Sequence, residues 1–374
     1  MQKKILAAAI AAAFSTGALA AEVTMNGAID TYVALNHGGD DWESALSSGG
    51  VNATHWGLKG TEEIGSSQVF FNLDTAVLSD SGEKAASGGG RMWSREANVG
   101  VRGKYGSLSF GRQYTPHFLT FLFYDPTGLS LGSSFSPYFM AGPHSTCGDQ
   151  GELVRIDNSV SYVLPTNFGL TNFFFAALGE AKRANGGTSS TKGNLYNYAA
   201  KYDCGPFSTM LSFAYSNYAN EVAGAAKKGS YDVKWLNYAI TYDFGVTKPV
   251  LEFEKKWGDK DHGSSSFWMV QLGTSTSVFG GKWMISGSYF KNQSRNDADS
   301  YSFGTKFNYP LSKRTRIYCG VEATFNEDRA GYAIEAGPDS SLHFNFDPAD
   351  PNGYSTNYLG KNVQQVFVGI SHEF

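Results

Sequence analysis

Residues 195–216 read LYNYAAKYDCGPFSTMLSFAYS, and this stretch decides the fold class. Before Gly205-Pro206 the even-numbered positions are aromatic or small and the odd-numbered ones are mostly polar or small, whereas after it the odd-numbered positions carry the larger apolar side chains. Successive side chains of a β-strand point to opposite faces of the sheet, and a Gly-Pro pair marks a tight turn. The stretch therefore predicts two antiparallel strands joined as a hairpin, each with one apolar face.

The same period of two continues along the chain. It predicts sixteen strands with turn signals between them, beginning near Val23, Ala53, Gln68, Arg91, Ser107, Ile156, Gly169, Leu195, Phe207, Trp235, Pro249, Phe267, Lys282, Ser300, Arg316 and Val363. Short connections such as Gly65-Ser66-Ser67 alternate with long ones such as His37 to Asn52. Even strand numbers, short turns on one rim and long loops on the other are typical of bacterial outer-membrane barrels.

A soluble β-sandwich would also alternate, but its outer faces would carry charges. Here aromatic residues crowd the strand ends, as Tyr202 and Phe207 do around one turn, which is typical of the interfacial girdles of a membrane barrel. The longest apolar run after Ala21 is Phe173 to Leu178, and a membrane-spanning helix needs about 20 residues. The fold class predicted is all-β, a 16-stranded antiparallel transmembrane β-barrel with short periplasmic turns and long extracellular loops.

The first twenty residues are predicted to be a signal peptide. Lys3 and Lys4 form a basic start, Ile5 to Phe14 is an apolar run of ten, and Ala18-Leu19-Ala20 offers a small-residue cleavage site. A retained membrane anchor would need a longer apolar run. We expect residues 1–20 to be removed and residues 21–374 to form the barrel.

Composition and motifs argue against several functions. The 34 acidic and 30 basic residues leave a net charge of −4, which speaks against nucleic-acid binding driven by bulk charge. Gly128-Leu129-Ser130-Leu131-Gly132 matches a hydrolase nucleophile pattern, but that motif works at a strand-to-helix turn of an α/β sheet, which the pattern of this chain does not predict. Histidine and cysteine spacings indicate no metal site, so we expect no enzyme activity, no metal and no cofactor.

Several motifs, in order along the chain, resemble one family. They are Trp56-Gly57-Leu58-Lys59-Gly60-Thr61-Glu62-Glu63, Val99-Gly100-Val101-Arg102-Gly103, Phe110-Gly111-Arg112-Gln113-Tyr114, Arg155-Ile156-Asp157-Asn158-Ser159, and Val368-Gly369-Ile370 with the terminal Phe374. The chain resembles the trimeric general diffusion porins of Gram-negative bacteria, in particular their neisserial and β-proteobacterial branch. The resemblance implies a homotrimer in the outer membrane, in contact with lipid and lipopolysaccharide. It also implies a multi-pass channel for small hydrophilic solutes and ions.

The resemblance further implies a constriction. In the family the third loop, here Thr115 to Leu153, folds into the barrel and narrows it. Basic wall residues carried over by position are His55, Arg95 and Arg155, and the loop acid is Asp125. Alternation independently places His55 and Lys59 on the face opposite Trp56 and Leu58, which favours a lumen position for both. The parity of Arg95 is ambiguous, and a solvated or subunit-facing position stays open for it.

The third loop departs from the family pattern. Pro126-Thr127-Gly128-Leu129 replaces the common Pro-Glu-Phe-Gly motif, so Leu129 stands where relatives carry a second acid. With one acid against two arginines and a histidine, we expect a weakly anion-selective constriction. Asp149 and Glu152 argue the other way if they line the vestibule. Two alternatives stay open, a channel for one solute class such as sugars or phosphate, served by aromatic residues of the third loop, and an adhesin with a plugged lumen.

Two further residues concern assembly. Arg112 shares the parity of Leu108 and Phe110, so it points out of the barrel, where a charge exposed to lipid would be costly. The family resemblance implies that an acid on the second loop of an adjacent subunit covers it, and Glu83 is the candidate, although a solvated Glu83 is an equal alternative. The resemblance also implies that Phe374 is read by the barrel assembly machinery.

Overall fold

The computed structural model describes residues 22–38, 42–85, 91–140, 153–178, 194–218, 231–262, 264–334 and 359–374. Within these ranges nearly all regular structure is β. The strands are β1 (Glu22–Gly38), β2 (Trp42–Ser48), β3 (His55–Ile64), β4 (Ser67–Ala76), β5 (Glu96–Gly103), β6 (Gly106–Tyr114), β7 (Arg155–Val163), β8 (Leu170–Ala177), β9 (Leu195–Cys204), β10 (Phe207–Tyr218), β11 (Tyr231–Tyr242), β12 (Thr247–Trp257), β13 (Phe267–Val278), β14 (Gly281–Asn292), β15 (Ser300–Pro310), β16 (Thr315–Asn326) and β17 (Val363–Glu373). The helical segments are α2 (Pro116–Tyr124), α3 (Ser136–Met140) and a 3-10 turn at Lys260–His262.

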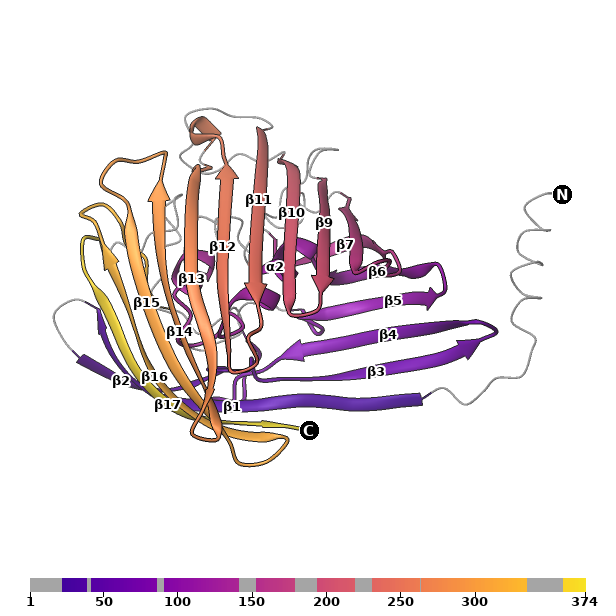
Figure 1. The fold of residues 1–374 in the computed structure, drawn as a ribbon, viewed down its shortest axis with the longest axis horizontal. Coiled ribbons are helices and arrows are strands. Elements are labelled where there is room, and N and C mark those ends of the chain that lie inside the picture. Colours follow the sequence, from indigo (N-terminus) through magenta and orange to yellow (C-terminus); the bar gives the residue numbers. More distant parts are fainter. Residues whose placement is uncertain are drawn as a thin grey trace.

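Sixteen of these strands close into an antiparallel barrel. Each strand from β3 to β17 pairs with the next one along the chain, and β1 closes the ring by pairing with β17 on one side and β3 on the other. The additional short strand β2 pairs with the second half of β1. In Figure 1 strands β3 to β6 run horizontally, while β9 to β13 run from top to bottom. Such a crossing is expected for the opposite walls of a barrel whose strands are tilted.

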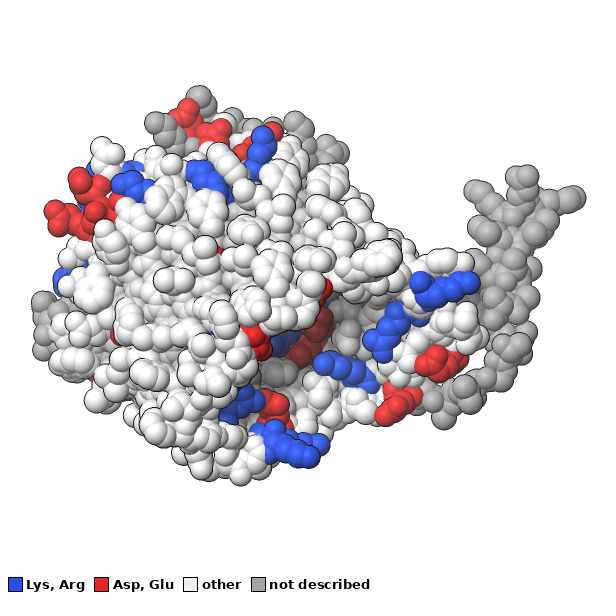
Figure 2. All heavy atoms as spheres, in the orientation of Figure 1, with Lys and Arg blue, Asp and Glu red and all other residues white. Residues whose placement is uncertain are grey.

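Alternation of burial along the strands confirms the predicted two-faced wall. In β11 the residues Tyr231, Val233 and Trp235 are buried, while their neighbours face outward. The outer face carries exposed apolar residues on every side, including Leu211, Leu251, Leu272, Val321 and Val368. Figure 2 shows that the middle of the near wall has almost no charged side chains, whereas Lys, Arg, Asp and Glu gather toward its rims. Such an outer band is the surface that a bilayer requires.

The hairpin at Gly205-Pro206 shows how the sequence sets the turns. Tyr202 pairs with Thr209, and Gly205 takes a positive φ of 56°, a conformation that glycine adopts at little cost. The side chains of Tyr202 and Phe207 lie together, with ring centroids 6.4 Å apart. Short connections of this kind lie at one end of the barrel, and we call this end the short-turn rim.

Most predicted strand starts lie within a few residues of the observed ones. One difference is β5, which begins at Glu96 rather than near Arg91, because the backbone carbonyl of Ser94 accepts a hydrogen bond from Arg112 instead of joining the ladder. The other is β2, which the alternation did not predict. No helix among the described residues is long and apolar enough to span a membrane. The predicted signal peptide lies outside the described residues.

Candidate functional site

The segment after β6 enters the barrel as a short helix, α2. Thr115 is its N-cap, accepting a hydrogen bond from the Phe118 N–H at 3.1 Å, and Pro116 fills the first turn, where a missing N–H costs nothing. The helix lies inside the barrel because the His117 N–H donates to Asn197 Oδ1 on the inner face of β9 at 2.7 Å. This confirms the inward-folded loop for the described part, residues 115–140.

His117 anchors this helix to the wall. Its Nε2 lies 3.0 Å from Glu254 Oε1 of β12, and its Nδ1 lies 3.2 Å from Ser212 Oγ of β10. The side chains of both His117 and Glu254 are fully buried. A buried ionisable pair of this kind is costly to break from one side, because the remaining partner stays desolvated.

The aromatic residues of α2 mostly face the wall. Phe118 and Phe121 are buried in a cluster with Phe135, Phe267 and Phe290, and Tyr124 is 2% exposed. Only Phe123 is open, with 45% of its surface exposed. The aromatic track that a dedicated sugar channel would use is therefore absent from this helix.

Asp125, the predicted loop acid, is occupied by its own loop. Its carboxylate accepts hydrogen bonds from the Thr127 N–H at 2.8 Å and hydroxyl at 2.6 Å, and from the Leu129 N–H at 3.0 Å. Ser133 Oγ donates at 2.6 Å, and Gln271 of β13 donates at 2.9 Å. Asp125 is 5% exposed. It shapes the turn after α2 and fixes it to the wall, and its described contacts do not join it to the basic residues.

The loop rests on glycines of the wall. A Cβ on Gly304 of β15 would lie 2.2 Å from the Gly132 carbonyl oxygen, and one on Gly273 of β13 would lie 2.6 Å from Pro126 Cγ. Beside this contact Gly132 N–H donates to Glu322 Oε2 at 2.6 Å, and Lys306 donates to Ser130 Oγ. Ser130, the serine of the apparent hydrolase pattern, thus lies on a barrel wall rather than at a strand-to-helix turn.

The opposite wall carries part of the predicted basic cluster. His55 Nε2 lies 3.9 Å from Asp74 Oδ2 of β4, and Arg95 Nε lies 3.5 Å from the same oxygen. Asp74 pairs with Gly57 in the sheet, which places Asp74 on the face shared by His55, Gly57 and Lys59. Lys59 is exposed. The structure therefore brings His55 and Arg95 together around an acid that the sequence analysis missed.

Arg155 lies at the start of β7. Its Nη2 donates to the Tyr114 hydroxyl at 3.1 Å, and its guanidinium lies over the Tyr114 ring at 4.9 Å from the centroid. Arg155 is 3% exposed. Its described contacts are with β6, next to the base of the loop, and not with the His55 and Arg95 pair.

Arg112 points to the outer face, paired with Ala97, and has a partner in its own chain. Its Nη1 donates to Asp157 Oδ1 at 2.7 Å, and Arg91 donates to the other oxygen of the same carboxylate at 2.9 Å. Asp157 reaches Arg112 because the register of β6 and β7 shifts between Gly111 and Gln113. The sequence analysis named the need for a partner but missed Asp157.

Glu83 and Phe374 lie at the surface. Glu83 is exposed in the turn after β4, and its backbone carbonyl accepts from Leu78 N–H at 2.8 Å. The Phe374 ring lies over Gly27, where an added Cβ would be 2.6 Å from Cζ.

The acids and bases of the inner wall that the sequence analysis did not single out had a signal. Glu252, Glu254 and Lys256 share one parity of β12, opposite Leu251 and Phe253. That parity would have been enough to place them inside the barrel. Within the described ranges no three His, Cys, Asp or Glu side chains cluster as metal ligands.

Comparisons with known proteins agree on one family. The sequence pattern of the family described as Gram-negative porin matches residues 7–329. An outer membrane porin protein of Bordetella pertussis is 28% identical over 399 positions, covering 90% of this chain and 99% of the relative. Outer membrane porin protein 32 of Delftia acidovorans is 27% identical, covering 90% of this chain and 93% of the relative.

Solved structures show the same barrel. An anion-selective porin from Comamonas acidovorans matches with a TM-score of 0.77 and 25% identity, covering 95% of this chain and all of the other. OmpT of Vibrio cholerae in its trimer form matches with a TM-score of 0.65 and 15% identity, over 95% of this chain and 100% of that one, which supports the fold alone.

Proposed function

The chain belongs to the Gram-negative porin family, and from this premise we propose that its outer-membrane channel passes small hydrophilic solutes and ions with a weak preference for anions. Porins are diffusion channels rather than enzymes. The barrel spans the outer membrane in sixteen strands, and its lumen is the route for diffusion. The selectivity is the part of this function that needs its own argument.

The observation that supports the selectivity is that Asp125 is buried in its own loop, away from the path of permeating ions. It is the only acid among residues 115–140, and five hydrogen bonds from its loop and from Gln271 hold its carboxylate. The described loop thus offers permeating ions no accessible carboxylate. In a narrow gap the sign of the wall charges then determines which ions enter.

Burial elsewhere acts in the same direction. Among the described residues, seven carboxylates are buried, Asp30, Asp74, Asp125, Glu252, Glu254, Asp299 and Glu322, against four buried arginines and lysines, Arg112, Arg155, Lys256 and Lys306, and the buried His117. Exposed Lys59 lies on the inner parity of β3 and faces the lumen. Asp74 offsets part of the charge of His55 and Arg95, so the preference is weak. The relative from Comamonas acidovorans described as anion-selective supports the same direction.

A reversal-potential measurement tests the selectivity. Under a salt gradient in a planar bilayer we expect the wild-type current to reverse at a potential shifted from zero toward the equilibrium potential of the anion. Arg95→Ala should move the reversal potential toward cation preference, and Arg155→Ala should move it the same way but less, because Arg155 is only 3% exposed. The control is Lys255→Ala, which removes the same charge from the outer face of β12, beside Trp257. Unchanged reversal potentials in both arginine variants would refute the selectivity.

The quaternary structure and the leader belong to the same proposal. We propose a homotrimer, supported by the trimer form of Vibrio cholerae OmpT, in which Glu83 of one subunit adds a contact to Arg112 of the next. Glu83→Ala should then lower the temperature at which the oligomer dissociates on a gel.

We also propose that residues 1–20 are cleaved, which the mass of the purified protein tests. The assembly role of Phe374 predicts poor insertion of Phe374→Ser by the barrel assembly machinery.

A further inference from the structure

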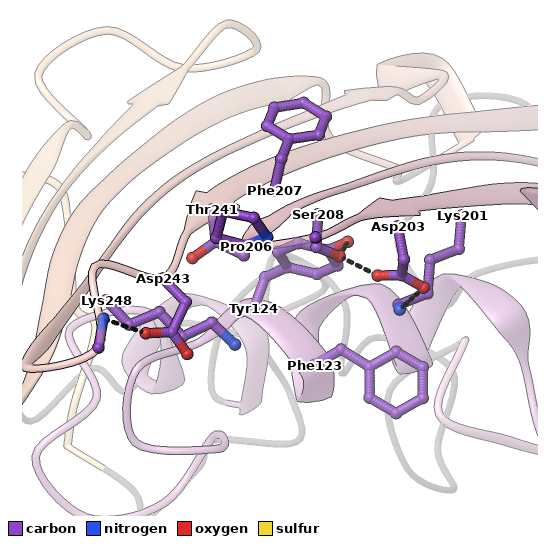
Figure 3. A pocket seen from close by; sticks show the side chains of 12 residues that line it. Phe123, Tyr124, Lys201, Asp203, Pro206, Phe207, Ser208, Thr241, Asp243 and Lys248 are labelled. Atoms are coloured by element: carbon purple, nitrogen blue, oxygen red, sulfur yellow. Dashed lines mark hydrogen bonds and ion pairs between the residues drawn. The ribbon is translucent and has the colours of Figure 1, made fainter. Parts of the chain in front are cut away.

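A cavity of about 810 Å³ lies inside the barrel at the short-turn rim. Its walls come from the end of α2 and from the strand ends beside two turns, those joining β9 to β10 and β11 to β12. Figure 3 shows Asp243 and Lys248 on one side of the Tyr124 ring and Lys201 and Asp203 on the other. A solute leaving or entering the constriction at this rim passes the cavity.

The end of α2 gives the cavity an aromatic wall. Phe123 is the open aromatic residue of the helix, and Tyr124 is fixed by a hydrogen bond of 2.6 Å between its hydroxyl and Ser208 Oγ. Burial raises the pKa of Tyr124 to about 12, so its hydroxyl is neutral at physiological pH. Phe123 therefore offers the cavity an apolar ring for a flat side chain, and the buried Tyr124 beside it adds no charge.

One pair of charges in the cavity is already satisfied. Lys201 donates to Asp203 Oδ2, and Ser208 Oγ donates to Asp203 Oδ1 at 2.6 Å. Both carboxylate oxygens of Asp203 thus have partners from the wall itself. This side of the cavity is close to neutral and leaves little affinity for an ion.

The other pair is different. Asp243 Oδ1 accepts a hydrogen bond from Gly245 N–H at 2.7 Å, which leaves its second oxygen without a partner in the described chain. Lys248 is half-buried and lies close enough to Asp203 to interact with it electrostatically, but among the described residues its ammonium makes no ion pair or hydrogen bond. A half-buried ammonium retains full hydrogen-bonding capacity for a ligand. The cavity thus presents one ammonium group and one carboxylate oxygen that can each take a further hydrogen bond from a ligand.

We propose that this cavity binds a small zwitterion with a flat apolar side chain, of the aromatic α-amino acid class. Lys248 receives the carboxylate, Asp243 receives the ammonium, and Phe123 packs against the ring. The inference rests on the open channel of the proposed function, because the solute reaches the cavity through the lumen or from the periplasm. It adds a weak solute-binding step to an otherwise general pore.

Charge decides among ligands that carry the same ring. An anion of this shape would be attracted by Lys248 but repelled by Asp243. A cation would be attracted by Asp243 but repelled by Lys248. Only a zwitterion uses both groups. Exposed ion pairs contribute modestly, so each charged partner is expected to change affinity by only about threefold to tenfold.

The test is current blockade of single channels in a planar bilayer. Phenylalanine, 3-phenylpropionate and phenethylamine are added in turn to the compartment that faces the short-turn rim. We expect phenylalanine to block at concentrations about fivefold lower than either analogue. Lys248→Gln, Asp243→Asn and Phe123→Ala should each weaken its block about threefold to tenfold. Lys282→Gln, which removes an exposed lysine at the start of β14 outside the cavity, should leave the block unchanged.

Equal block by all three compounds would overturn the proposal. So would a Lys248→Gln channel that phenylalanine blocks as strongly as it blocks the wild type. Equilibrium dialysis of labelled phenylalanine against the detergent-purified protein gives the same comparison without current. A protein that binds phenylalanine but passes no current would refute the open channel while upholding the site. Steady current without blockade or binding would refute the site and leave the channel standing.

Discussion

The two sides of the lumen use charged residues in opposite ways. Behind the loop, on β12 to β16, Glu254, Lys306 and Glu322 are at most 4% exposed and each contacts loop residues. On the opposite wall, formed by β3 to β7, Lys59 is exposed and His55 and Arg95 keep 19% and 14% of their side-chain surface. We call these the covered wall and the open wall.

The difference teaches that residue type does not decide function here. A glutamate on the covered wall holds the loop, whereas the same charge on the open wall would act on passing ions. What separates the two roles is whether the loop lies over the residue. Substitutions on the covered wall should therefore change stability and pore size, and those on the open wall should change selectivity.

The largest effect is expected for Glu254→Ala on the covered wall. It leaves His117 buried without its carboxylate, which should lower the free energy of unfolding by about 3–5 kcal/mol and loosen the loop. Guanidinium titration in detergent and single-channel conductance measure the two effects. The double variant His117→Phe, Glu254→Leu should recover much of the stability, because neither member of the pair then stays buried without the other. A stable Glu254→Ala protein with wild-type conductance would contradict the anchoring role of this pair.

The next effect concerns the open wall, which residues 115–140 of the loop do not cover and which a cluster of charged residues on its outer face supports. Asp157→Ala removes the shared partner of Arg91 and Arg112 and should cost about 2–3 kcal/mol of unfolding free energy. Selectivity should stay as in the wild type, because the three residues lie on the outer face. A shift in reversal potential without loss of stability would mean that this cluster faces the lumen.

Gly304→Ala tests how closely the loop lies on the covered wall. The added Cβ would meet the Gly132 carbonyl oxygen at 2.2 Å, so the loop must move, at about 1–3 kcal/mol. Conductance should change as the loop shifts. Gly287→Ala on the neighbouring strand is the matched control, since its Cβ would have nothing closer than the Ser302 carbonyl oxygen at 3.9 Å. Identical behaviour of the two variants would remove the argument for close loop contact.

The smallest effect is expected for Asp125→Asn. One carboxylate oxygen is replaced by a donor facing Ser133 or Thr127, which should cost about 1 kcal/mol. The reversal potential should stay within error of the wild type. A clear shift toward anions would show that Asp125 acts on permeating ions, and the distinction between the two walls would fail at that residue.

Local periodicity predicted the barrel well, because it follows from the chain alone. The parity of Tyr196, Leu211 and Val368 identified the outer face, and turn residues such as Gly205 set the ends of strands. The site was less accessible to this reasoning. That Asp125 bonds its own turn and that Asp74 sits between His55 and Arg95 depend on contacts across the sheet, and parity gives the face of a residue but not its neighbours.

The Asp157 partner of Arg112 shows the same limit. A one-residue register shift between β6 and β7 brings the two side chains together, and no local pattern in the sequence predicts such a shift. The parity of Glu254 within its strand could have placed this acid inside the barrel. Its role as an anchor of the loop could not be predicted without the position of His117.

The seam between β1 and β17 has a consequence for how the molecule is made. Ala28 pairs with Glu373 and Gly38 with Val363, and Gly27 and Phe374 exchange backbone hydrogen bonds of 3.2 and 3.0 Å. Strands from opposite ends of the described chain thus complete the ring, and a chain in which β17 has not yet paired with β1 would have two unpaired strand edges. Such edges invite pairing with other chains, so closure of this seam removes the surface on which aggregation would begin.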